Sequence, residues 1–236
     1  MVYFQIHSFA SPEILKSTES LCHVVNKGYN VPRFQYNIIT TPRIKNNTTL
    51  LEDFSIDDPS NAYLVFCFQE PDRNVDLHVI NDELIEDAQT TKEKLLQLHP
   101  NVDLAETKIV YDTFIGGVES LKLPDRLDDS LLGMICLKPH EEESFEITGF
   151  VSFYKNIGTK LIEVCELFAK EKLEAKSLHI TAIHEHNLRK MYEKWGFTFD
   201  QRVKVPLSQE GVSSDHLEDN IGATQDFHLD LMSKYL

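Results

Sequence analysis

The sequence predicts a mixed α/β fold, in which helices pack on a central sheet. The 236 residues are 42% hydrophobic and 26% charged, which is enough apolar material for a sizeable core. Between residues 131 and 205, β-rich segments alternate with amphipathic ones, as strands and helices do when they follow each other along a chain. No linker divides the sequence, so we expect residues 1–236 to form a single domain.

The amino-terminal segment predicts a strand followed by a helix. Residues 2–9, VYFQIHSF, are rich in strand formers. Residues 11–13, Ser-Pro-Glu, then supply a capping hydroxyl, a proline suited to the first turn and an acidic side chain. Apolar residues on one face continue this helix, and Gly28 is placed to end it. Residues 30–60, rich in Pro, Asn, Thr and Asp, predict loop with at most one short element.

The middle of the chain predicts one helix and several strands. The helix covers residues 83–98, where acidic residues precede basic ones in the order that a helix dipole favours. The strands are apolar, β-rich runs at 62–68, 108–115, 131–138 and 146–151. The connection between the last two, PHEEESF, has the length of a hairpin loop. We therefore expect these two strands to be antiparallel neighbours.

The last third of the chain alternates strands with helices. Apolar residues at spacings of three and four predict a helix over 159–173. A shorter helix is expected over 188–195, followed by Gly196. The remaining strands are expected at 177–183, 197–205 and 226–232.

Charge and cysteine content narrow the function classes. The formal net charge of −15 argues against nucleic-acid binding, which depends on many Lys and Arg, and favours cationic partners. No apolar run reaches the roughly 18 residues that cross a bilayer, and the first residues lack the layout of a secretory signal. We expect a cytoplasmic protein without membrane contact, with the nucleus as the alternative compartment. The four cysteines are widely spaced and are expected to be buried free thiols.

A candidate anion site lies where the strand at 146–151 leads into the next helix. The chain passes through a turn near Gly158 and then opens a helix. Helix amino termini present unpaired N–H groups and a partial positive charge, to which Lys155 and Lys160 would add their own. The segment therefore predicts a cradle for phosphate, although a plain turn would have the same pattern.

A second segment gives this first one a context. The residues after the strand at 177–183 end in YEKWGF at 192–197. Together with IGTKLIE at 157–163, this segment resembles the GCN5-related N-acetyltransferase (GNAT) superfamily, whose members transfer an acyl group from coenzyme A to an amine. The resemblance is best over 131–205 and leaves 30–130 as an elaborated region. It implies a mostly antiparallel mixed sheet, splayed around an acyl-coenzyme A cleft, with helices on both faces.

The resemblance also implies where acetyl-coenzyme A is held. In the family, the pantetheine arm lies along the splayed strand and the pyrophosphate lies on the turn that opens the long helix, mainly through backbone contacts. The implied cofactor-binding residues are Thr148, Gly149, Phe150, Val151, Lys155, Asn156, Ile157, Gly158, Thr159, Lys160 and Asn187.

The turn departs from the family's usual pattern at two positions. Phe153 replaces the first polar residue and Asn156 replaces the first glycine. Asparagine tolerates a left-handed backbone better than most residues, so the turn can keep its shape. A turn shortened by three residues, with Val151 kept in the strand, is an alternative alignment.

The resemblance implies that Tyr192 stands near the thioester sulfur and protonates the departing thiolate. A tyrosine so close to Trp195 could instead pack at the edge of the core. Attack by an amine also needs a group that removes a proton from the ammonium ion. Glu146 is our first candidate for this base and Asp112 is the second, with exposed strand-end acids as the alternative interpretation.

No metal is expected. His184 and His186 would share a face of an extended strand, but no third ligand appears at a suitable spacing. The function implied by the resemblance is an N-acetyltransferase that acts by direct attack in a ternary complex. A non-catalytic module that binds coenzyme A or a protein partner is the alternative. Acidity favours a small cationic amine or a lysine-bearing peptide as acceptor, and we expect a monomer or homodimer.

Overall fold

The structure is a computed structural model, which describes residues 2–69, 104, 107–118, 120–127, 130–208, 211–212 and 221–236. The helix expected at 83–98 lies outside these residues. The strands are β1 (Val2–Ser8), β2 (Tyr63–Gln69), β3 (Thr107–Tyr111), β4 (Leu131–Pro139), β5 (Ser144–Ser152), β6 (Ser177–Ile183), β7 (Thr198–Val205), β8 (Leu207–Ser208), β9 (Gly211–Val212) and β10 (Phe227–Tyr235). The helices are α1 (Pro12–Lys16), α2 (Thr18–Tyr36), α3 (Leu50–Asp53), α5 (Ile157–Lys172) and α6 (Arg189–Lys194), with short 3-10 turns η1 (Pro59–Asn61), η4 (Thr113–Ile115) and η6 (His184–His186).

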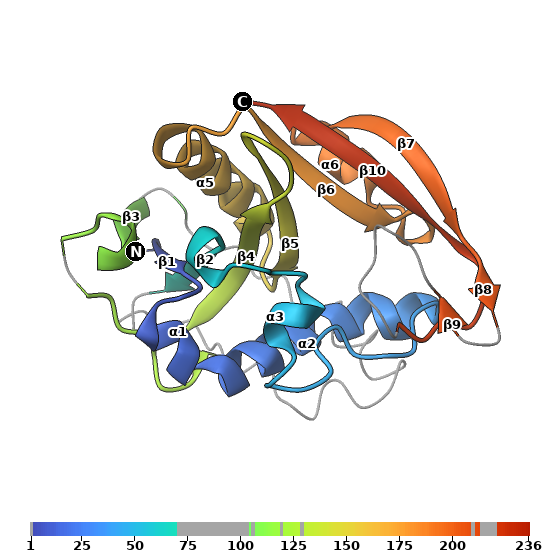
Figure 1. Cartoon of the computed structure of the whole chain (residues 1–236), viewed down its shortest axis with the longest axis horizontal. Coiled ribbons are helices and arrows are strands. Elements are labelled where there is room, and N and C mark those ends of the chain that lie inside the picture. Colours follow the sequence, from blue (N-terminus) through green and yellow to red (C-terminus); the bar gives the residue numbers. More distant parts are fainter. Residues whose placement is uncertain are drawn as a thin grey trace.

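Within the described residues, the central sheet has eight strands in the order β3-β1-β2-β4-β5-β6-β10-β7 (Figure 1). The pairs β1–β3 and β5–β6 are parallel, and the other neighbours are antiparallel. The sheet is therefore mixed and mostly antiparallel, as expected. The strands β4 and β5 form the expected antiparallel hairpin pair.

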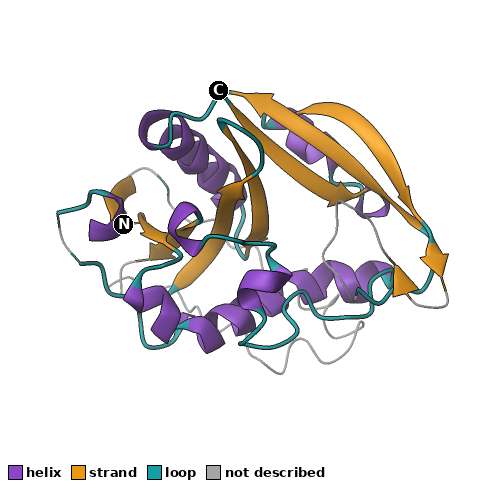
Figure 2. Ribbon diagram, viewed as in Figure 1, coloured by secondary structure: helices purple, strands orange, loops and turns teal. Residues whose placement is uncertain are grey.

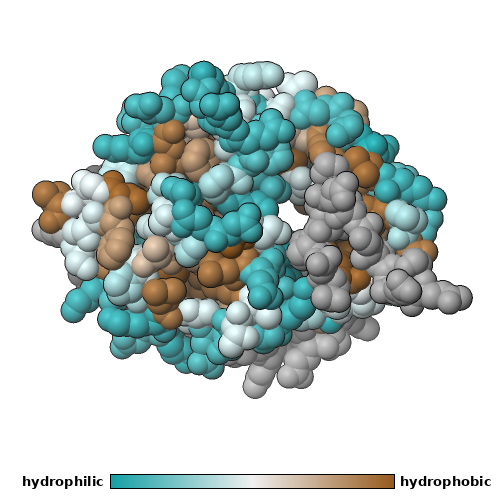
Figure 3. All heavy atoms as spheres, in the orientation of Figure 1, coloured by the Kyte–Doolittle hydropathy of each residue, from teal (hydrophilic) through white to brown (hydrophobic). Residues whose placement is uncertain are grey.

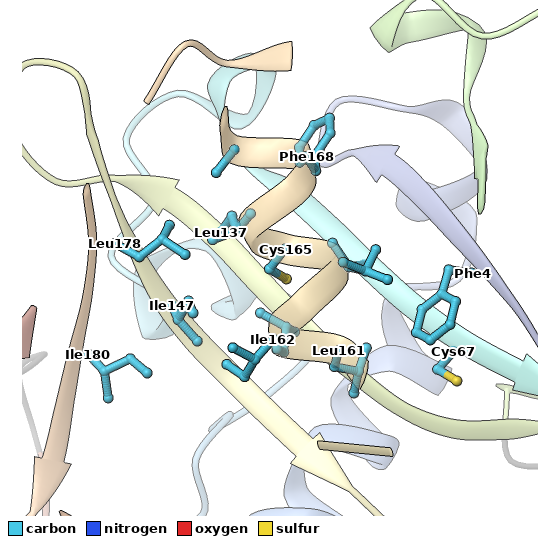
Figure 4. Packing of buried hydrophobic residues seen from close by; sticks show 14 of the residues in the cluster. Phe4, Cys67, Leu137, Ile147, Leu161, Ile162, Cys165, Phe168, Leu178 and Ile180 are labelled. Atoms are coloured by element: carbon cyan, nitrogen blue, oxygen red, sulfur yellow. The ribbon is translucent and has the colours of Figure 1, made fainter. Parts of the chain in front are cut away.

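Helices cover both faces of the sheet (Figure 2). Along β2, Leu64, Phe66 and Phe68 belong to the core cluster that packs against α1, α2 and α3. The intervening Val65 and Cys67 belong to the cluster that packs against α5. Figure 4 shows side chains of this second cluster gathered around α5. A strand buried on both faces reads as a continuous apolar run, which is why residues 62–68 lack an alternating pattern.

The helix α2 corrects one expectation about the first helix. Gly28 does not end it, because α2 continues to Tyr36 and is followed by Asn37 in a left-handed conformation, with φ of 51°. A Cβ atom on Gly28 would lie 2.3 Å from Cγ1 of Val151 on β5. Glycine is needed here so that the helix can approach the strand closely. The sequence pattern for a helix end and for close packing is the same at this residue.

Two further segments differ from expectation in detail. The region 30–60 contains the last turns of α2, the short α3 and η1, so it has more regular structure than expected. The strand expected at 108–115 ends at Tyr111 and gives way to η4.

All four cysteines are buried and free, as expected. Among the described helices, none is both long enough and apolar enough to cross a bilayer.

Candidate functional site

The candidate site begins where β5 and β6 separate. Residues 144–147 of β5 pair with residues 177–180 of β6, and beyond this point the two strands no longer pair. Figure 1 shows them meeting near the carboxyl terminus and running apart. The expected splay of the sheet is therefore present, and beyond residue 147 it frees the edge of β5 with which β6 would otherwise pair.

A β-bulge accompanies this separation. Thr148 on β5 lies opposite Cys136 on β4, and Val151 lies opposite Met134, so the register shifts between them. The two strand positions between Thr148 and Val151 thus face a single position on β4. Gly149 lies in the bulge with φ of +55°, a conformation that favours glycine. Such a bulge bends a strand and turns its side chains, which here directs β5 away from β6.

A cavity of about 240 Å³ lies at the separation. Its walls come from α2 and the segment after it, from β5 and β6, and from η6 and α6. In the space-filling view an opening lies beside β5 and above α2 (Figure 3). A pocket between diverging strands is a common place for a small molecule to bind.

The structure brings together some of the expected site residues and not others. Glu146, Thr148, Phe150 and Tyr192 line the cavity. The remaining nine, Asn187 among them, are absent from its described lining. Seven of these are Gly149, Lys155, Asn156, Ile157, Gly158, Thr159 and Lys160. Val151 is also outside it, because its side chain is buried towards α2. Asn187 follows η6 and donates a hydrogen bond to the carbonyl of Glu185 at 3.1 Å.

Tyr192 is both a core residue and a cavity residue. Its side chain is 7% exposed, and its ring packs edge-on against Trp195 and Phe197. Burial, with a contribution from Tyr29, raises its pKa well above the usual range for tyrosine. The phenol therefore keeps its proton at neutral pH, as a proton donor must. The two interpretations from the sequence, a proton donor and a residue that packs at the edge of the core, are therefore compatible with each other.

The two acidic candidates for the base lie in different places. Glu146 lines the cavity, and its carboxylate forms an ion pair with Nζ of Lys138 at 3.2 Å. Asp112 is buried after β3, where its Oδ2 lies 3.1 Å from Nδ1 of His7. Asp112 is not part of the described cavity lining, so its place in the fold is that of a structural partner for His7.

The start of α5 has the left-handed backbone that its sequence predicts. Asn156 precedes the helix with φ of 71°, in the left-handed region, where asparagine replaces the glycine of the family's turn. The indole N–H of Trp195 donates to Oγ1 of Thr159 at 3.1 Å, and the rings of Phe150 and Trp195 lie 5.7 Å apart. A Cβ atom on Gly158 would come within 3.3 Å of Phe150 and 3.4 Å of Trp195. The small residue at 158 thus makes room for these two rings.

Two further cavity residues could not be found from the sequence. Arg43 donates a hydrogen bond to Oγ1 of Thr148 at 3.2 Å and another to the carbonyl of Asp53. Its guanidinium lies over the rings of Tyr29, at 5.7 Å, and Phe54, at 5.3 Å. These partners come from three separate segments, and no local spacing in the sequence indicates that they meet.

His186 is the second of them. It is 9% exposed, its ring stacks on Tyr36 with centroids 4.6 Å apart, and the Tyr36 hydroxyl donates to its carbonyl at 3.1 Å. Burial lowers its pKa to about 4, so the imidazole is neutral at neutral pH. Its Nε2 atom has no hydrogen-bond partner among the described residues. From the sequence this histidine is a candidate only as a metal ligand, and no cluster suited to a metal ion occurs among the described residues.

Two features of the site suit a thioester substrate, namely the bulged strand β5 and the phenol of Tyr192. A bulged strand that faces a cavity offers backbone groups to an extended arm, and Tyr192 offers a proton beside it. At the start of α5, the first-turn amides are the groups that bind phosphate in general. The residues present are therefore compatible with acetyl-coenzyme A at both ends.

Comparison with known proteins gives the family. The model of the family described as "Sporulation protein RMD6" matches residues 2–236. The sporulation protein RMD6 of Saccharomyces cerevisiae is 30% identical over 234 residues, which cover 95% of this chain and 92% of the yeast protein. Solved structures that resemble this chain include an acetyltransferase of the GNAT family from Streptococcus pneumoniae. Its sequence is 10% identical, 99% of each chain is covered, and the TM-score is 0.47. A spermidine N-acetyltransferase chimera of Vibrio cholerae SpeG and hSSAT has 13% identity over 94% of this chain and 90% of its own, with a TM-score of 0.43. On the match along its whole length, the chain belongs to the sporulation protein RMD6 family.

Proposed function

We propose that this protein is an N-acetyltransferase that transfers an acetyl group from acetyl-coenzyme A to a primary amine in a ternary complex. One observation carries the proposal. A buried, protonated tyrosine, Tyr192, lines a cavity that opens where a bulge at Gly149 turns β5 away from β6. This arrangement combines a strand edge for a thioester with a proton donor for the group that leaves.

The residues of the cavity then divide the chemistry between them. The acceptor nitrogen forms a bond to the thioester carbonyl carbon, and the carbon–sulfur bond breaks. Tyr192 gives its proton to the departing thiolate and regains one from water. Glu146 takes the proton that the acceptor nitrogen loses, directly or through a water molecule. The backbone of residues 148–151 holds the pantetheine arm, and the first turn of α5 holds the phosphates.

A second candidate function is a non-catalytic module that binds coenzyme A or a protein partner. The observation that favours it lies at the far end of the site. Phe150 and Trp195 pack where a side chain at Gly158 would lie, and residues 155–160 are outside the described cavity lining. A chain whose role is to bind a protein partner would be under no constraint to keep this end of the site open, so the observation favours the protein-binding form of this alternative.

Two measurements on the full chain separate these functions. The proposed enzyme should be stabilised by acetyl-coenzyme A, by about 2.7 kcal/mol at one hundred times its Kd. It should also release free thiol from acetyl-coenzyme A when a primary amine is added. Stabilisation without thiol release across a panel of amines would support the binding module. Absence of both would contradict the two functions together.

The biological setting also belongs to the proposal. The yeast relative is named a sporulation protein, so we infer that this chain acts in sporulating cells. A cytoplasmic location, with the nucleus as the alternative, and a monomeric or dimeric state remain predictions.

A further inference from the structure

The side chain of Trp195 contacts three parts of the proposed site. Trp195 follows α6 directly, and its ring lies edge-on to that of Tyr192, with the ring centroids 5.6 Å apart. The indole N–H donates to Oγ1 of Thr159 in α5 at 3.1 Å. The same indole lies 5.7 Å from the ring of Phe150 on β5. One side chain is therefore a common contact for the proposed proton donor, the start of α5 and the strand that lines the cavity.

The contact with Thr159 lies in the first turn of α5, where the proposed function puts the phosphates of coenzyme A. Thr159 is the third residue of this helix, and its hydrogen bond to the indole joins residues that are 36 positions apart in the chain. A Cβ atom on Gly158 would come within 3.4 Å of Trp195. The glycine thus lets the indole approach the helix closely enough to reach the threonine hydroxyl.

The backbone of Trp195 is tied to the same helix by a second route. Its carbonyl accepts a hydrogen bond from Nζ of Lys234 at 2.7 Å, and this ammonium also forms an ion pair with Glu166, further along α5. Gly196 follows with φ of +87°, and a Cβ atom there would lie 3.1 Å from Cε of Lys234. Residue 195 is therefore fixed to α5 at two points, one through its side chain and one through its carbonyl.

These ties matter because a proton donor acts only when it is held within hydrogen-bond reach of the leaving group. Tyr192 belongs to α6, which has only six residues, and so short a helix has little stability of its own. The position of the phenol therefore depends on what α6 and the residues after it contact. Phe197 supplies one ring against Tyr192, with centroids 6.1 Å apart, and Trp195 supplies the contact that leads to α5.

We propose that Trp195 is a positioning residue, whose hydrogen bond to Thr159 fixes Tyr192 relative to the first turn of α5. The proton donor and the phosphate end of the site then form one unit. This inference rests on the N-acetyltransferase function above and deepens it by assigning how the proton donor is placed. The alternative is a role in packing alone, in which the hydrogen bond adds stability and leaves the reaction unchanged.

The first experiment removes the hydrogen bond from each end, in the full chain. Trp195→Phe keeps an aromatic ring beside Tyr192 and removes the N–H, whereas Thr159→Val keeps the size of the side chain and removes the hydroxyl. We expect each change to lower kcat for thiol release about tenfold, with the KM for the amine unchanged, because a less precisely held group reacts more slowly. Thr159→Ser retains the hydroxyl and should retain most of kcat. Thr107→Val, at an exposed position on β3, is the matched control.

A second comparison shows whether the effect acts through Tyr192. In the Tyr192→Phe background the proton donor is absent, so Thr159→Val should cause no further loss of kcat. The melting temperature of each variant shows whether it is folded. A loss of kcat that is equal with and without the Tyr192 hydroxyl would overturn the proposal. A lower melting temperature with kcat unchanged would do the same and leave Trp195 with packing alone.

The indole N–H also separates this inference from the proposed function, because it can be observed without turnover. Trp195 is the only tryptophan in the chain, so the NMR spectrum of an isotope-labelled sample has a single indole N–H resonance. We expect Thr159→Val to shift this resonance, and coenzyme A to shift it in the unmodified chain. Both shifts without thiol release from any amine would retain the link and contradict the enzyme. A resonance that ignores either change would contradict the link, whether or not thiol is released.

Discussion

The two sides of the cavity are built in different ways. The proposed cofactor side consists of the bulged β5 in the lining together with the start of α5, which lies outside the described lining, and its expected contacts are mainly to backbone. The proposed acceptor side consists of α2 and the segment after it, and its character comes from side chains such as Arg43 and Lys45. A site made from backbone leaves its trace in strands, turns and helix starts, whereas a site made from side chains on an irregular segment leaves almost none. The difference explains why one side resembles a known family and the other does not.

The two sides meet at Gly149, and the largest effect is expected there. Gly149→Ala must place a side chain at φ of +55°, and its Cβ would lie 2.7 Å from Cζ of Phe54 on the acceptor side. We expect the free energy of unfolding to fall by about 2–4 kcal/mol, from the left-handed backbone together with overpacking. Chemical denaturation measures this loss.

A matched glycine separates the two causes. Gly116 also has a positive φ, +81°, but a Cβ there would meet no atom within 4 Å. Gly116→Ala should therefore show the backbone cost alone, about 1–2 kcal/mol. Trimming Phe54 to Leu in the Gly149→Ala background should recover part of the difference. Equal losses at the two glycines would show that the contact between the two sides contributes nothing.

The cofactor side is tested next at Tyr192. Tyr192→Phe keeps the ring that packs on Trp195 and Phe197 but removes the proton donor. We expect kcat for thiol release to fall about 100-fold, the lower range for loss of a general acid, while the melting temperature changes little. Tyr235→Phe, at a tyrosine that is 86% exposed, is the control. An unchanged kcat would leave Tyr192 with its packing role only.

The sequence predicted most strands of the sheet and the left-handed turn that opens α5 for reasons that are local. The strand at 177–183 and the hairpin of β4 and β5 follow from alternation and from a short connection. The prediction that the first helix ends at Gly28 was wrong, because close packing on Val151 requires glycine, the same residue type that often ends a helix. The contact between Arg43 and Thr148 was not predicted, because the two residues are 105 positions apart in the chain. Net charge favours a cationic acceptor, and this stays a prediction, since composition does not record which charges share a cavity.

The acceptor side also makes folding sensitive to mild acid through His186. Its folded pKa of about 4 lies below the usual histidine pKa of 6.5, so the unfolded chain binds a proton first as pH falls. Its contribution to stability is therefore complete above about pH 6.5 and is lost towards pH 4. Between pH 7.5 and 5.5 this should cost about 1 kcal/mol. His186→Phe keeps a ring against Tyr36 and should remove that part of the slope, measured by urea denaturation at each pH. A slope equal to that of the unmodified protein would contradict the neutral, buried imidazole.

The smallest effect is expected at the far end of the cofactor side, at Asn156. Asn156→Gly relieves a left-handed backbone with φ of 71°, whereas Asn156→Ala keeps the strain and lacks the tolerance of asparagine. The Gly variant should be more stable than the Ala variant by about 0.5–1 kcal/mol. The pair also tests where phosphate binds, because neither change removes a backbone amide from the first turn of α5. If the phosphates of acetyl-coenzyme A lie on these amides, the Kd for acetyl-coenzyme A should depend on how readily residue 156 adopts the left-handed conformation. The Gly variant should then bind at least as tightly as the unmodified protein, and the Ala variant should bind more weakly. Identical Kd values in all three proteins would place the phosphates elsewhere, and the resemblance at the start of α5 would then be one of fold without its binding role.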